Sequence, residues 1–375
     1  MESAAKSLKL LVVLLLAITL YPGALFAQHY TQTNLVSDIM GAAPTHDPSL
    51  VNAWGLSRSS TSPWWVANNG SGTSTLYNGN TGAIIPINGN GIVTIPPPKK
   101  APAGTISTPT GTVFNGSADF VLPAPNSKPA AFIFATEDGT ISGWNGGPSA
   151  VLAVDNNHNG SANGAVYKGA TTADINGTRF LYVTNFRAGR VEVYDTNFMR
   201  VRLSEDAFDA GDEVPNGFAP FNVQNIGGSL FVTYAMQDAA RHDDVAGDGN
   251  GFVEVFTPSG AHIGHLQHGP WLNSPWGVVW TPRDFGEFSN TILVGNFGSG
   301  WIAAFNGFTY KFIGFMKNPD DSILTIDGLW SLAFGNGTNA GPSTTLFFSA
   351  GPEHESHGLF GTLTPVKAEL DGDEE

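Results

Sequence analysis

A strand–turn–strand pattern recurs six times along the chain and limits the possible folds more than any other feature. Each copy has an apolar strand rich in aromatic residues, a turn rich in Gly or Asn, and a second strand in which apolar side chains alternate. Alternation on both arms is typical of β-hairpins. The marker residues that align the first strands are Ala67, Ala135, Thr184, Thr233, Gly295 and Ser349.

A further apolar strand, with Trp beside a small residue, precedes several of the hairpins. It reads VNAWGLS from Val51, SPWGVVW from Ser274 and DGLWSLAFG from Asp327. An apolar strand, a hairpin and an outer strand together make a β-propeller blade, and blades bury their faces only by stacking around an axis. The sequence therefore predicts an all-β, six-bladed β-propeller. Seven blades are the alternative, if the interval between Ala67 and Ala135 contains a degenerate blade.

Two details of the pattern concern packing and closure of the ring. Trp64 and Trp65 open the first hairpin and are expected to pack between blades, since large aromatic side chains dominate such contacts. The segment YTQTNLVSDI, from Tyr30, resembles a strand but belongs to no hairpin. We expect it to supply the outer strand of the last blade, which removes an exposed sheet edge.

The two ends of the chain differ from the repeats. Lys6 and Lys9, the apolar run from Leu10 to Leu20 and the small residues near Ala27 match a signal peptide over residues 1–27. Residues 28–366 are then a single propeller domain, and residues 367–375 are an acidic tail. The expected product is secreted and has no membrane span once the signal peptide is removed.

Composition limits the partners. The formal net charge is −15, which disfavours nucleic acid and anionic lipid and is compatible with divalent cations, basic proteins or neutral glycans. The chain contains no cysteine, so disulfides and thiol chemistry are excluded. Five N-x-S/T sequons allow glycosylation where the host compartment supports it: Asn69, Asn115, Asn159, Asn176 and Asn336.

Several quoted segments resemble known families. SPWGVVW followed by ILVGNFGSGWIAAFNG resembles the NHL-type propeller repeat. The motifs NLVSDI, DPSLVNAWGLS, GAVYKGA, RHDDVAGDGNGFVEVF and ESHGLFG resemble those of a family of secreted, functionally uncharacterised proteins found largely in bacteria. This resemblance implies a propeller fold and secretion, and it implies no established activity.

The insertion RHDDVAGDGNGF carries the densest group of polar side chains. Hard oxygen ligands at short spacing suit Ca²⁺, and His242 adds a weak candidate for a catalytic base. The alternative is a structured loop whose carboxylates cap backbone N–H groups. The candidate ligand-binding residues are Asp243, Asp244, Asp248 and Asn250.

Two further groups are weaker candidates. On an extended strand Glu355 and His357 share one face, where they can act as a general base or as metal ligands; a surface turn is the alternative. A resemblance to calcium-dependent six-bladed lactonases implies a cation held by residues that close the first strands of the hairpins. Those residues are Asn68, Glu137, Asn185 and Asn296.

The histidine-rich run HIGHLQHG, residues 262–269, is expected to be a connection between blades. Together these features favour a secreted binding module with a polar mouth that holds Ca²⁺ and an extracellular ligand, either a glycan or a protein. The first alternative is a Ca²⁺-dependent hydrolase or lyase that acts at the propeller tunnel. A structural component of a wall or matrix is the second.

Overall fold

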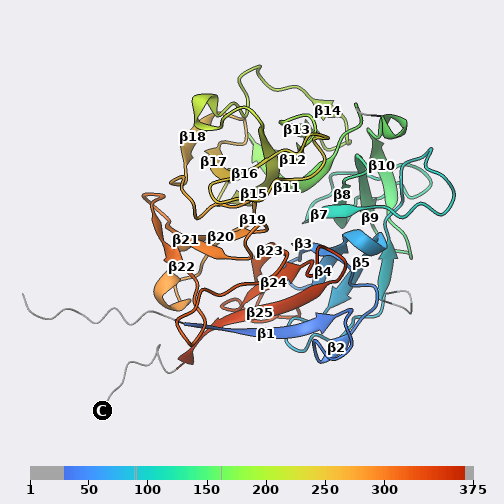
Figure 1. Ribbon diagram of the computed structural model, residues 1–375. Coiled ribbons are helices and arrows are strands. Elements are labelled where there is room, and N and C mark those ends of the chain that lie inside the picture. Colours follow the sequence, from blue (N-terminus) through green and yellow to red (C-terminus); the bar gives the residue numbers. More distant parts are fainter. Residues whose placement is uncertain (1–28, 88, 90, 162, 368–375) are drawn as a thin grey trace, which may run out of the picture.

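The computed structural model describes residues 29–367 except 88, 90 and 162, and it confirms the six-bladed β-propeller. Six sheets are arranged around one axis (Figure 1). The signal peptide predicted over residues 1–27 lies outside the described residues, as does most of the acidic tail. No helix among the described residues is both long and apolar enough to cross a membrane.

The first five blades each have four strands. The strands are numbered in chain order, and within each of these blades the numbers rise from the innermost strand to the outermost. Blade 1 contains β3 (Ala53–Ser57), β4 (Trp64–Asn68), β5 (Thr73–Tyr77) and β6 (Ile92–Thr94), and blade 2 contains β7 (Pro109–Phe114), β8 (Phe132–Thr136), β9 (Thr140–Trp144) and β10 (Val151–Asp155). Blade 3 contains β11 (Tyr167–Ile175), β12 (Thr178–Asn185), β13 (Arg190–Tyr194) and β14 (Arg200–Val201), and blade 4 contains β15 (Phe218–Ile226), β16 (Ser229–Met236), β17 (Gly251–Phe256) and β18 (His262–His265). Blade 5 contains β19 (Pro275–Trp280), β20 (Thr291–Asn296), β21 (Ile302–Asn306) and β22 (Phe312–Phe315).

The sixth blade joins the two ends of the chain, as the sequence predicts. Its strands are β23 (Leu329–Phe334), β24 (Leu346–Ala350), β25 (Leu359–Pro365), β1 (Tyr30–Ser37) and β2 (Thr45–His46). β1 pairs antiparallel with β25, from Tyr30 opposite Pro365 to Ser37 opposite Leu359 (Figure 1). The N-terminal strand thereby covers the edge of the last hairpin and closes the ring.

Glycines on the innermost strands allow neighbouring blades to approach the axis. A Cβ added to Gly55 would lie 2.3 Å from the carbonyl oxygen of Thr110 in the next blade. One added to Gly169 would lie 2.1 Å from Asn222 Oδ1, and one added to Gly277 would lie 2.6 Å from the carbonyl oxygen of Trp330. The small residues beside Trp are thus required by close packing of strands rather than by a turn.

The paired tryptophans of blade 1 pack between blades, which confirms the expectation from the sequence. Trp64 faces blade 6, with its ring centroid 5.1 Å from that of Phe347. Trp65 faces blade 2 and stacks on Phe132 at 4.2 Å. Successive side chains of a strand point to opposite faces, so one Trp–Trp pair contributes to two interfaces.

The histidine-rich run was expected to be a connection, and this prediction is wrong for its first half. His262–His265 forms β18, the outer strand of blade 4, which pairs with β17. Short 3₁₀ turns connect other elements; they are η1 (Asn69–Ser71), η2 (His158–Gly160), η3 (Gly211–Glu213) and η4 (Gly286–Phe288).

Candidate functional site

The innermost strands all carry an irregularity at the same height. In every blade the pairing register between the first and second strand shifts within the first residues of the inner strand. Such bulges re-aim side chains and are frequent beside functional sites. The side chains at these shifts are Trp54, Thr110, Lys168, Phe221, Trp276 and Trp330.

Four of these side chains form an aromatic plug in the tunnel, defined as Trp54, Phe221, Trp276 and Trp330. Trp54 stacks on Trp330 with centroids 3.6 Å apart, and Trp276 meets both edge-on at 6.4 and 6.1 Å. Phe221 lies 5.9 Å from Trp330. All four are buried, so the plug closes the tunnel with an apolar layer.

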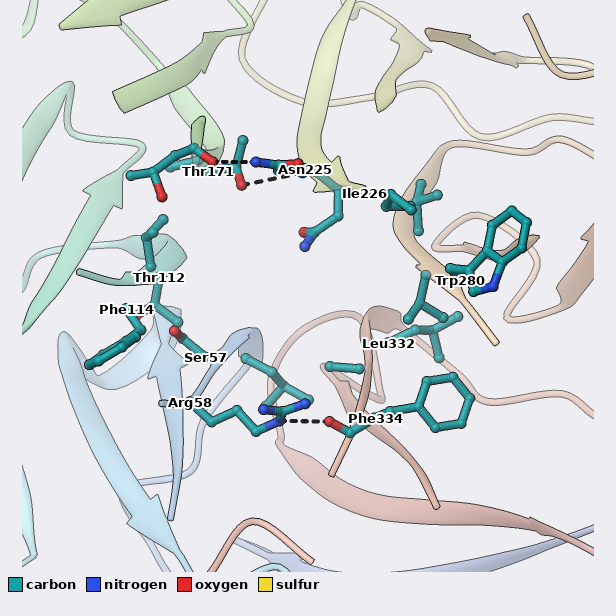
Figure 2. A pocket seen from close by; sticks show the side chains of 18 of the residues that line it. Ser57, Arg58, Thr112, Phe114, Thr171, Asn225, Ile226, Trp280, Leu332 and Phe334 are labelled. Carbon is teal, nitrogen blue, oxygen red and sulfur yellow. Dashed lines mark hydrogen bonds between the residues drawn. The ribbon is translucent and has the colours of Figure 1, made fainter. Parts of the chain in front are cut away.

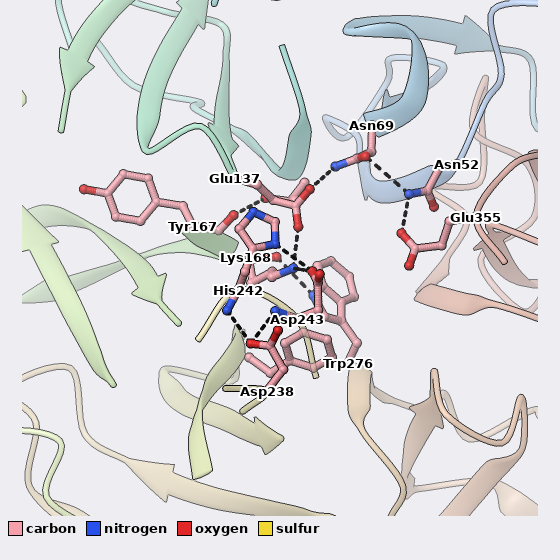
Figure 3. A network of polar contacts seen from close by, with 12 residues as sticks. Asn52, Asn69, Glu137, Tyr167, Lys168, Asp238, His242, Asp243, Trp276 and Glu355 are labelled. Atoms are coloured by element: carbon pink, nitrogen blue, oxygen red, sulfur yellow. Dashed lines mark hydrogen bonds and ion pairs between the residues drawn. The ribbon is translucent and has the colours of Figure 1, made fainter. Parts of the chain in front are cut away.

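Lys168 takes the place that Trp occupies in three other blades. Its side chain is only 2% exposed, and its ammonium lies 5.3 Å from the centroid of the Trp54 ring. Lys168 Nζ donates to Glu137 Oε1 and lies 3.2 Å from Asp243 Oδ1 (Figure 3). Burial acts to lower the pKa of Lys168, but the charges of Glu137, Asp243 and Asp244 outweigh it, so this pKa is raised and the ammonium persists.

A chain of amides links this ion pair to blades 1 and 6. Asn69 Nδ2 donates to Glu137 Oε2 at 2.7 Å, and Asn52 Nδ2 donates to Asn69 Oδ1 at 3.3 Å. Asn52 Nδ2 also donates to Glu355 Oε2 at 2.6 Å (Figure 3). Asn52 Oδ1 accepts from Trp330 Nε1 at 2.9 Å. Residues from blades 1, 2, 3, 4 and 6 therefore meet at one end of the tunnel.

We call this assembly the polar mouth, and define it as Asn52, Asn69, Glu137, Lys168, His242, Asp243 and Glu355. Hairpin turns supply most of it: Glu137 lies between β8 and β9, Asp243 between β16 and β17, and Glu355 between β24 and β25. The turn of blade 4 is fixed because Asp238 Oδ1 accepts from the backbone N–H of His242 at 2.8 Å. The polar mouth lies against the aromatic plug: the Lys168 ammonium is 5.3 Å from the centroid of the Trp54 ring, and Trp330 Nε1 donates to Asn52 Oδ1.

Several titratable groups of the polar mouth have shifted pKa values. Burial, and then repulsion by Glu137, raise the pKa of Glu355 to about 7. The contact between His242 Nδ1 and Asp243 Oδ1, 2.8 Å apart, raises the pKa of His242 and, together with Lys168, holds the pKa of Asp243 well below its usual range. Burial raises the pKa of Asp244. Shifts of this kind cluster at functional sites.

The structure brings together only some of the residues predicted from the sequence. Glu137, His242 and Asp243 have ligand atoms within 4.8 Å of one another, and Glu355 joins the same network. Asp248 is exposed farther along the blade 4 insertion, where Asn250 Nδ2 donates to the carbonyl oxygen of Val245 at 3.0 Å. A role of these residues in ligand binding stays a prediction.

The predicted ring of four hairpin residues contributes Glu137 alone to the polar mouth. Asn68 Nδ2 donates to Thr75 Oγ1 at 3.0 Å, inside its own blade. Asn185 Nδ2 donates to Glu192 Oε1 at 3.0 Å, and Asn296 Oδ1 accepts from the N–H of Asn273 at 2.9 Å. These three amides hold turns within blades 1, 3 and 5, while binding of a metal by any of the four stays untested.

Glu355 and His357 lie in a turn, as the surface-turn interpretation predicts, and not on an extended strand, so they do not share one face. Glu353, His354 and Glu355 adopt positive φ angles of 55°, 56° and 65°, which form a left-handed turn. The turn sends Glu355 toward Asn52, whereas His357 Nδ1 meets Asp38 Oδ2 at 2.9 Å. Left-handed backbone outside glycine is costly and is found where a side chain must be aimed.

A cavity of about 480 Å³ opens at the other end of the tunnel (Figure 2). Each of the six inner strands lines it with three consecutive residues, many of them apolar, which lie at the C-terminal end of the strand except in β11, where they lie in the middle. Its polar groups tie blade to blade: Arg58 Nε donates to the carbonyl oxygen of Phe334 at 2.7 Å, and Asn225 Nδ2 donates to that of Thr172 at 2.8 Å. Trp276 of the plug lines a hollow of about 40 Å³ beneath this cavity.

Sequence reasoning missed Lys168, Asn52 and Asn69. A signal for Lys168 was present, because Lys168-Gly169 aligns with Trp54-Gly55 and Trp276-Gly277. A lysine at a position that holds Trp in three other blades indicates a polar replacement in the plug. In the sequence Asn69 is recognisable only as part of a sequon, and nothing around Asn52 indicates a functional side chain.

Comparisons with known sequences find relatives without an established function. No protein-family model matches the chain. One uncharacterised protein of Acanthamoeba polyphaga mimivirus is 34% identical over 230 residues, which cover 59% of this chain but only 41% of that protein. A second from the same virus is 28% identical over 340 residues, covering 88% of this chain and 78% of the relative. These relatives are viral, so the largely bacterial family and its motifs stay a prediction.

Solved structures support the fold alone. A virginiamycin B lyase from Staphylococcus aureus aligns with a TM-score of 0.50 at 11% identity, covering 90% of this chain and 100% of that one. A protein of unknown function from Bacteroides thetaiotaomicron aligns with a TM-score of 0.52 at 8% identity, covering 91% of this chain and 76% of the other. The chain is thus a six-bladed β-propeller similar to these proteins and to uncharacterised viral proteins.

Proposed function

We propose that the protein is a secreted binding module whose polar mouth takes a ligand with an ammonium or guanidinium group. Such groups occur on basic side chains of proteins and on the free amines of amino-sugar glycans. The observation that carries this proposal is the buried Lys168, which replaces a plug aromatic and fixes Glu137 and Asp243 at the mouth. A buried ion pair adds little stability over a well-packed apolar group, so binding explains its presence better.

Charge supports a cationic ligand. The mouth and its surroundings contain the carboxylates of Glu137, Asp243, Asp244 and Glu355, against the single ammonium of Lys168. The Asp243 side chain is 65% exposed, so it can accept charge-assisted hydrogen bonds from a ligand. The whole chain is acidic as well, which attracts cations to the mouth.

The same geometry disfavours the calcium site that the sequence suggested. The ammonium of Lys168 fills the space between Glu137 and Asp243, so a Ca²⁺ ion held by both carboxylates would contact this fixed positive charge. An organic cation can instead approach the exposed side of Asp243 from solvent, without entering that space. His242, the third group of this cluster, is also a poor ligand for a hard cation. We therefore propose that the ammonium of Lys168 takes the place of the Ca²⁺ ion expected at the propeller tunnel.

Isothermal titration calorimetry with arginine amide and with glucosamine oligomers tests the proposal. For arginine amide, whose guanidinium stays charged, we expect binding that strengthens as pH rises through 7, because Glu355 gains its charge there. Asp243→Asn and Glu355→Gln should each weaken binding about tenfold, the loss of one charge-assisted hydrogen bond. N-acetylated oligomers, which carry no charge, serve as the neutral control.

The matched control variant is Asp248→Asn, which changes the same charge on an exposed part of the same insertion. It should leave affinity unchanged. Equal losses in Asp248→Asn and Asp243→Asn would place binding on the outer insertion and contradict a site at the polar mouth. Equal affinity for charged and N-acetylated oligomers would contradict a cationic ligand.

A second candidate function is acid–base catalysis at the same mouth. Glu355, with a pKa of about 7, and His242, with a raised pKa, can exchange protons near neutral pH, as hydrolases and lyases require. One structural neighbour is named a lyase, but the likeness extends to the fold only. Turnover of a bound ligand that Glu355→Gln abolishes without weakening binding would favour this function.

Secretion is part of the proposal and rests on the leader-like residues 1–27. Expression of the full chain in a secreting host should release a product whose first residue is number 28. Recovery from the cells of a chain that still begins with residue 1 would contradict export by this route.

A further inference from the structure

Blades 3 and 4 carry the same unusual feature on their third strands. β13 contains Val-Glu-Val around Glu192, and β17 contains Val-Glu-Val around Glu254. Both glutamate side chains are only 2% exposed, in positions where the alternation of the strand otherwise gives apolar residues. A carboxylate buried in this way is costly unless it has partners, so the two sites can be compared by what surrounds each glutamate.

The partners of Glu192 are all hydrogen-bond donors. Tyr167 and Tyr194 each donate from their hydroxyl at 2.9 Å, Asn185 Nδ2 donates at 3.0 Å, and Arg190 donates at 2.9 and 3.1 Å. These contacts outweigh burial and lower the pKa of Glu192. Glu192 is therefore a structural carboxylate satisfied by the protein itself.

The surroundings of Glu254 have a different chemistry. His262 Nε2 lies 2.7 Å from Glu254 Oε2, and ligand atoms of Glu254, His262 and His265 all lie within 4.8 Å of one another. Glu213 of η3 adds a second carboxylate, with Oε2 3.8 Å from His265 Nδ1. Two imidazoles and two carboxylates are a donor set that binds divalent transition metals.

A bulge in β18 makes this arrangement possible. On a regular strand, residues three apart point to opposite faces, so His262 and His265 would diverge. Here Glu254 pairs with His265, Val255 with Gly264, and Phe256 with His262, so that Ile263 is left out of the register. The extra residue turns both imidazoles to the face of the sheet that carries Glu254.

We propose that Glu254, His262 and His265, with Glu213 as fourth ligand, form a zinc-class metal site at the rim of blade 4. In a tetrahedral Zn²⁺ site with bonds of about 2.0 Å, ligand atoms stand roughly 3.3 Å apart, which small side-chain movements reach from the present spacing. The ion would replace the direct contact between Glu254 Oε2 and His262 Nε2. It would fasten the outer strand β18 and the segment before blade 4 to β17.

Zinc uptake by the full-length protein tests this site. After removal of bound metal with a chelator, the protein is titrated with Zn²⁺ in a calorimeter and its content is measured by elemental analysis. We expect about one tightly held zinc ion per chain and a higher melting temperature with zinc. Substitution with Co²⁺ should give the intense visible absorption of a tetrahedral site.

Variants separate this site from others on the molecule. His265→Gln changes a half-exposed side chain that the fold does not require, and it should weaken zinc affinity at least tenfold. His268→Gln is the matched control: it belongs to the same histidine run, but its ring stacks on Phe252 and its Nε2 lies 3.1 Å from the carbonyl oxygen of Gly249. His242→Gln tests the polar mouth as the source of binding.

Loss of zinc binding in His265→Gln, with retention in His268→Gln and His242→Gln, would support the proposal. Unchanged zinc affinity in His265→Gln, or no uptake by the wild-type protein, would overturn it. Loss in His242→Gln alone would also overturn it, because the metal would then belong to the polar mouth.

Discussion

Lys168 places a buried positive charge among the aromatic side chains that fill the propeller tunnel. The repeat places aromatic side chains at the bulges of blades 1, 4, 5 and 6, where they pack into a dry plug. In blade 3 a lysine extends from the equivalent position, lies against the ring of Trp54, and pairs with Glu137 and Asp243. A cation beside an aromatic face and two carboxylates is held in one place.

Replacement of this lysine tests whether it stands in for a metal ion. Lys168→Met should destabilise the protein by about 2–4 kcal/mol, because it leaves Glu137 without its buried partner. Millimolar Ca²⁺ should restore part of this loss in the variant, since the freed carboxylates can then bind it, and should not affect the wild type. The measurement is the urea-unfolding free energy with and without Ca²⁺.

The double variant Lys168→Met/Glu137→Gln provides the control, because it removes both charges and should be less destabilised than Lys168→Met. Stabilisation of the wild type by Ca²⁺, abolished in Asp243→Asn, would contradict the view that Lys168 replaces the ion.

Glu355 makes stability depend on pH in a definite direction. Its pKa is about 7 in the folded protein and lies near its ordinary value in the unfolded chain, so the folded state binds this proton more tightly. The stabilisation conferred by the proton is present at acidic pH and is lost as pH rises through 7. Glu355→Gln should remove this loss and stabilise the protein by about 1–2 kcal/mol above pH 7, a figure that allows for partial hydration.

Urea unfolding of both proteins at several pH values measures the effect. The difference between them should vanish at acidic pH. A constant difference at all pH values would show that Glu355 titrates in its ordinary range.

At the scale of elements, the inner strands explain both the close packing and the site. Each begins with a register shift that turns one side chain toward the axis, and small residues beside the shift let the next blade approach. The residues at the register shifts therefore supply the side chains of the plug and Lys168, whereas the regularly alternating residues of the same strands pack between blades.

A substitution at one such glycine should be felt across two blades. Gly169→Ala places its Cβ 2.1 Å from Asn222 Oδ1 and 2.8 Å from Asn222 Cα, so the inner strands of blades 3 and 4 must separate. We expect a loss of about 1–3 kcal/mol. Gly314→Ala on the outer strand β22 is the control, because nothing lies within 4 Å of the added Cβ. Equal stability of the two variants would contradict the close approach at the axis.

The hairpins and the three Trp-containing inner strands could be predicted from the sequence because period-2 alternation and turn residues are local signals. The polar mouth could be predicted only in part. Asp243 and Glu355 lie in conspicuous polar turns, but their association with Asn52 and Lys168 depends on blade stacking. The left-handed turn at Glu353 and the bulge at Ile263 reverse the faces that regular strands would give.

At the scale of the whole molecule, ring closure by β1 holds the propeller together. Tyr30 is fully buried, its ring stacks on Phe288 of blade 5, and its hydroxyl donates to the carbonyl oxygen of Phe285 at 3.0 Å. β1 therefore completes blade 6 by pairing with β25, and it contacts blade 5 through Tyr30. We expect closure of this kind to make unfolding more cooperative.

Deletion of residues 29–38 should open the ring and expose the edge of β25. We expect a lower unfolding midpoint, a less cooperative transition and a tendency to associate through the free edge. Calorimetry and sedimentation measure these properties. Deletion of the acidic residues 368–375 is the control and should change neither; full cooperativity without β1 would contradict closure by this strand.

Binding of a cationic ligand at the polar mouth can be followed through the indole N–H signals of three tryptophans. Trp276 Nε1 donates to the carbonyl oxygen of Lys168 and Trp330 Nε1 donates to Asn52 Oδ1, whereas Trp280 lines the cavity at the opposite end. In a nuclear magnetic resonance titration with arginine amide, we expect saturable shifts of the Trp276 and Trp330 signals and a constant Trp280 signal. Shifts at Trp280 alone, or none at any of the three, would contradict binding at the polar mouth.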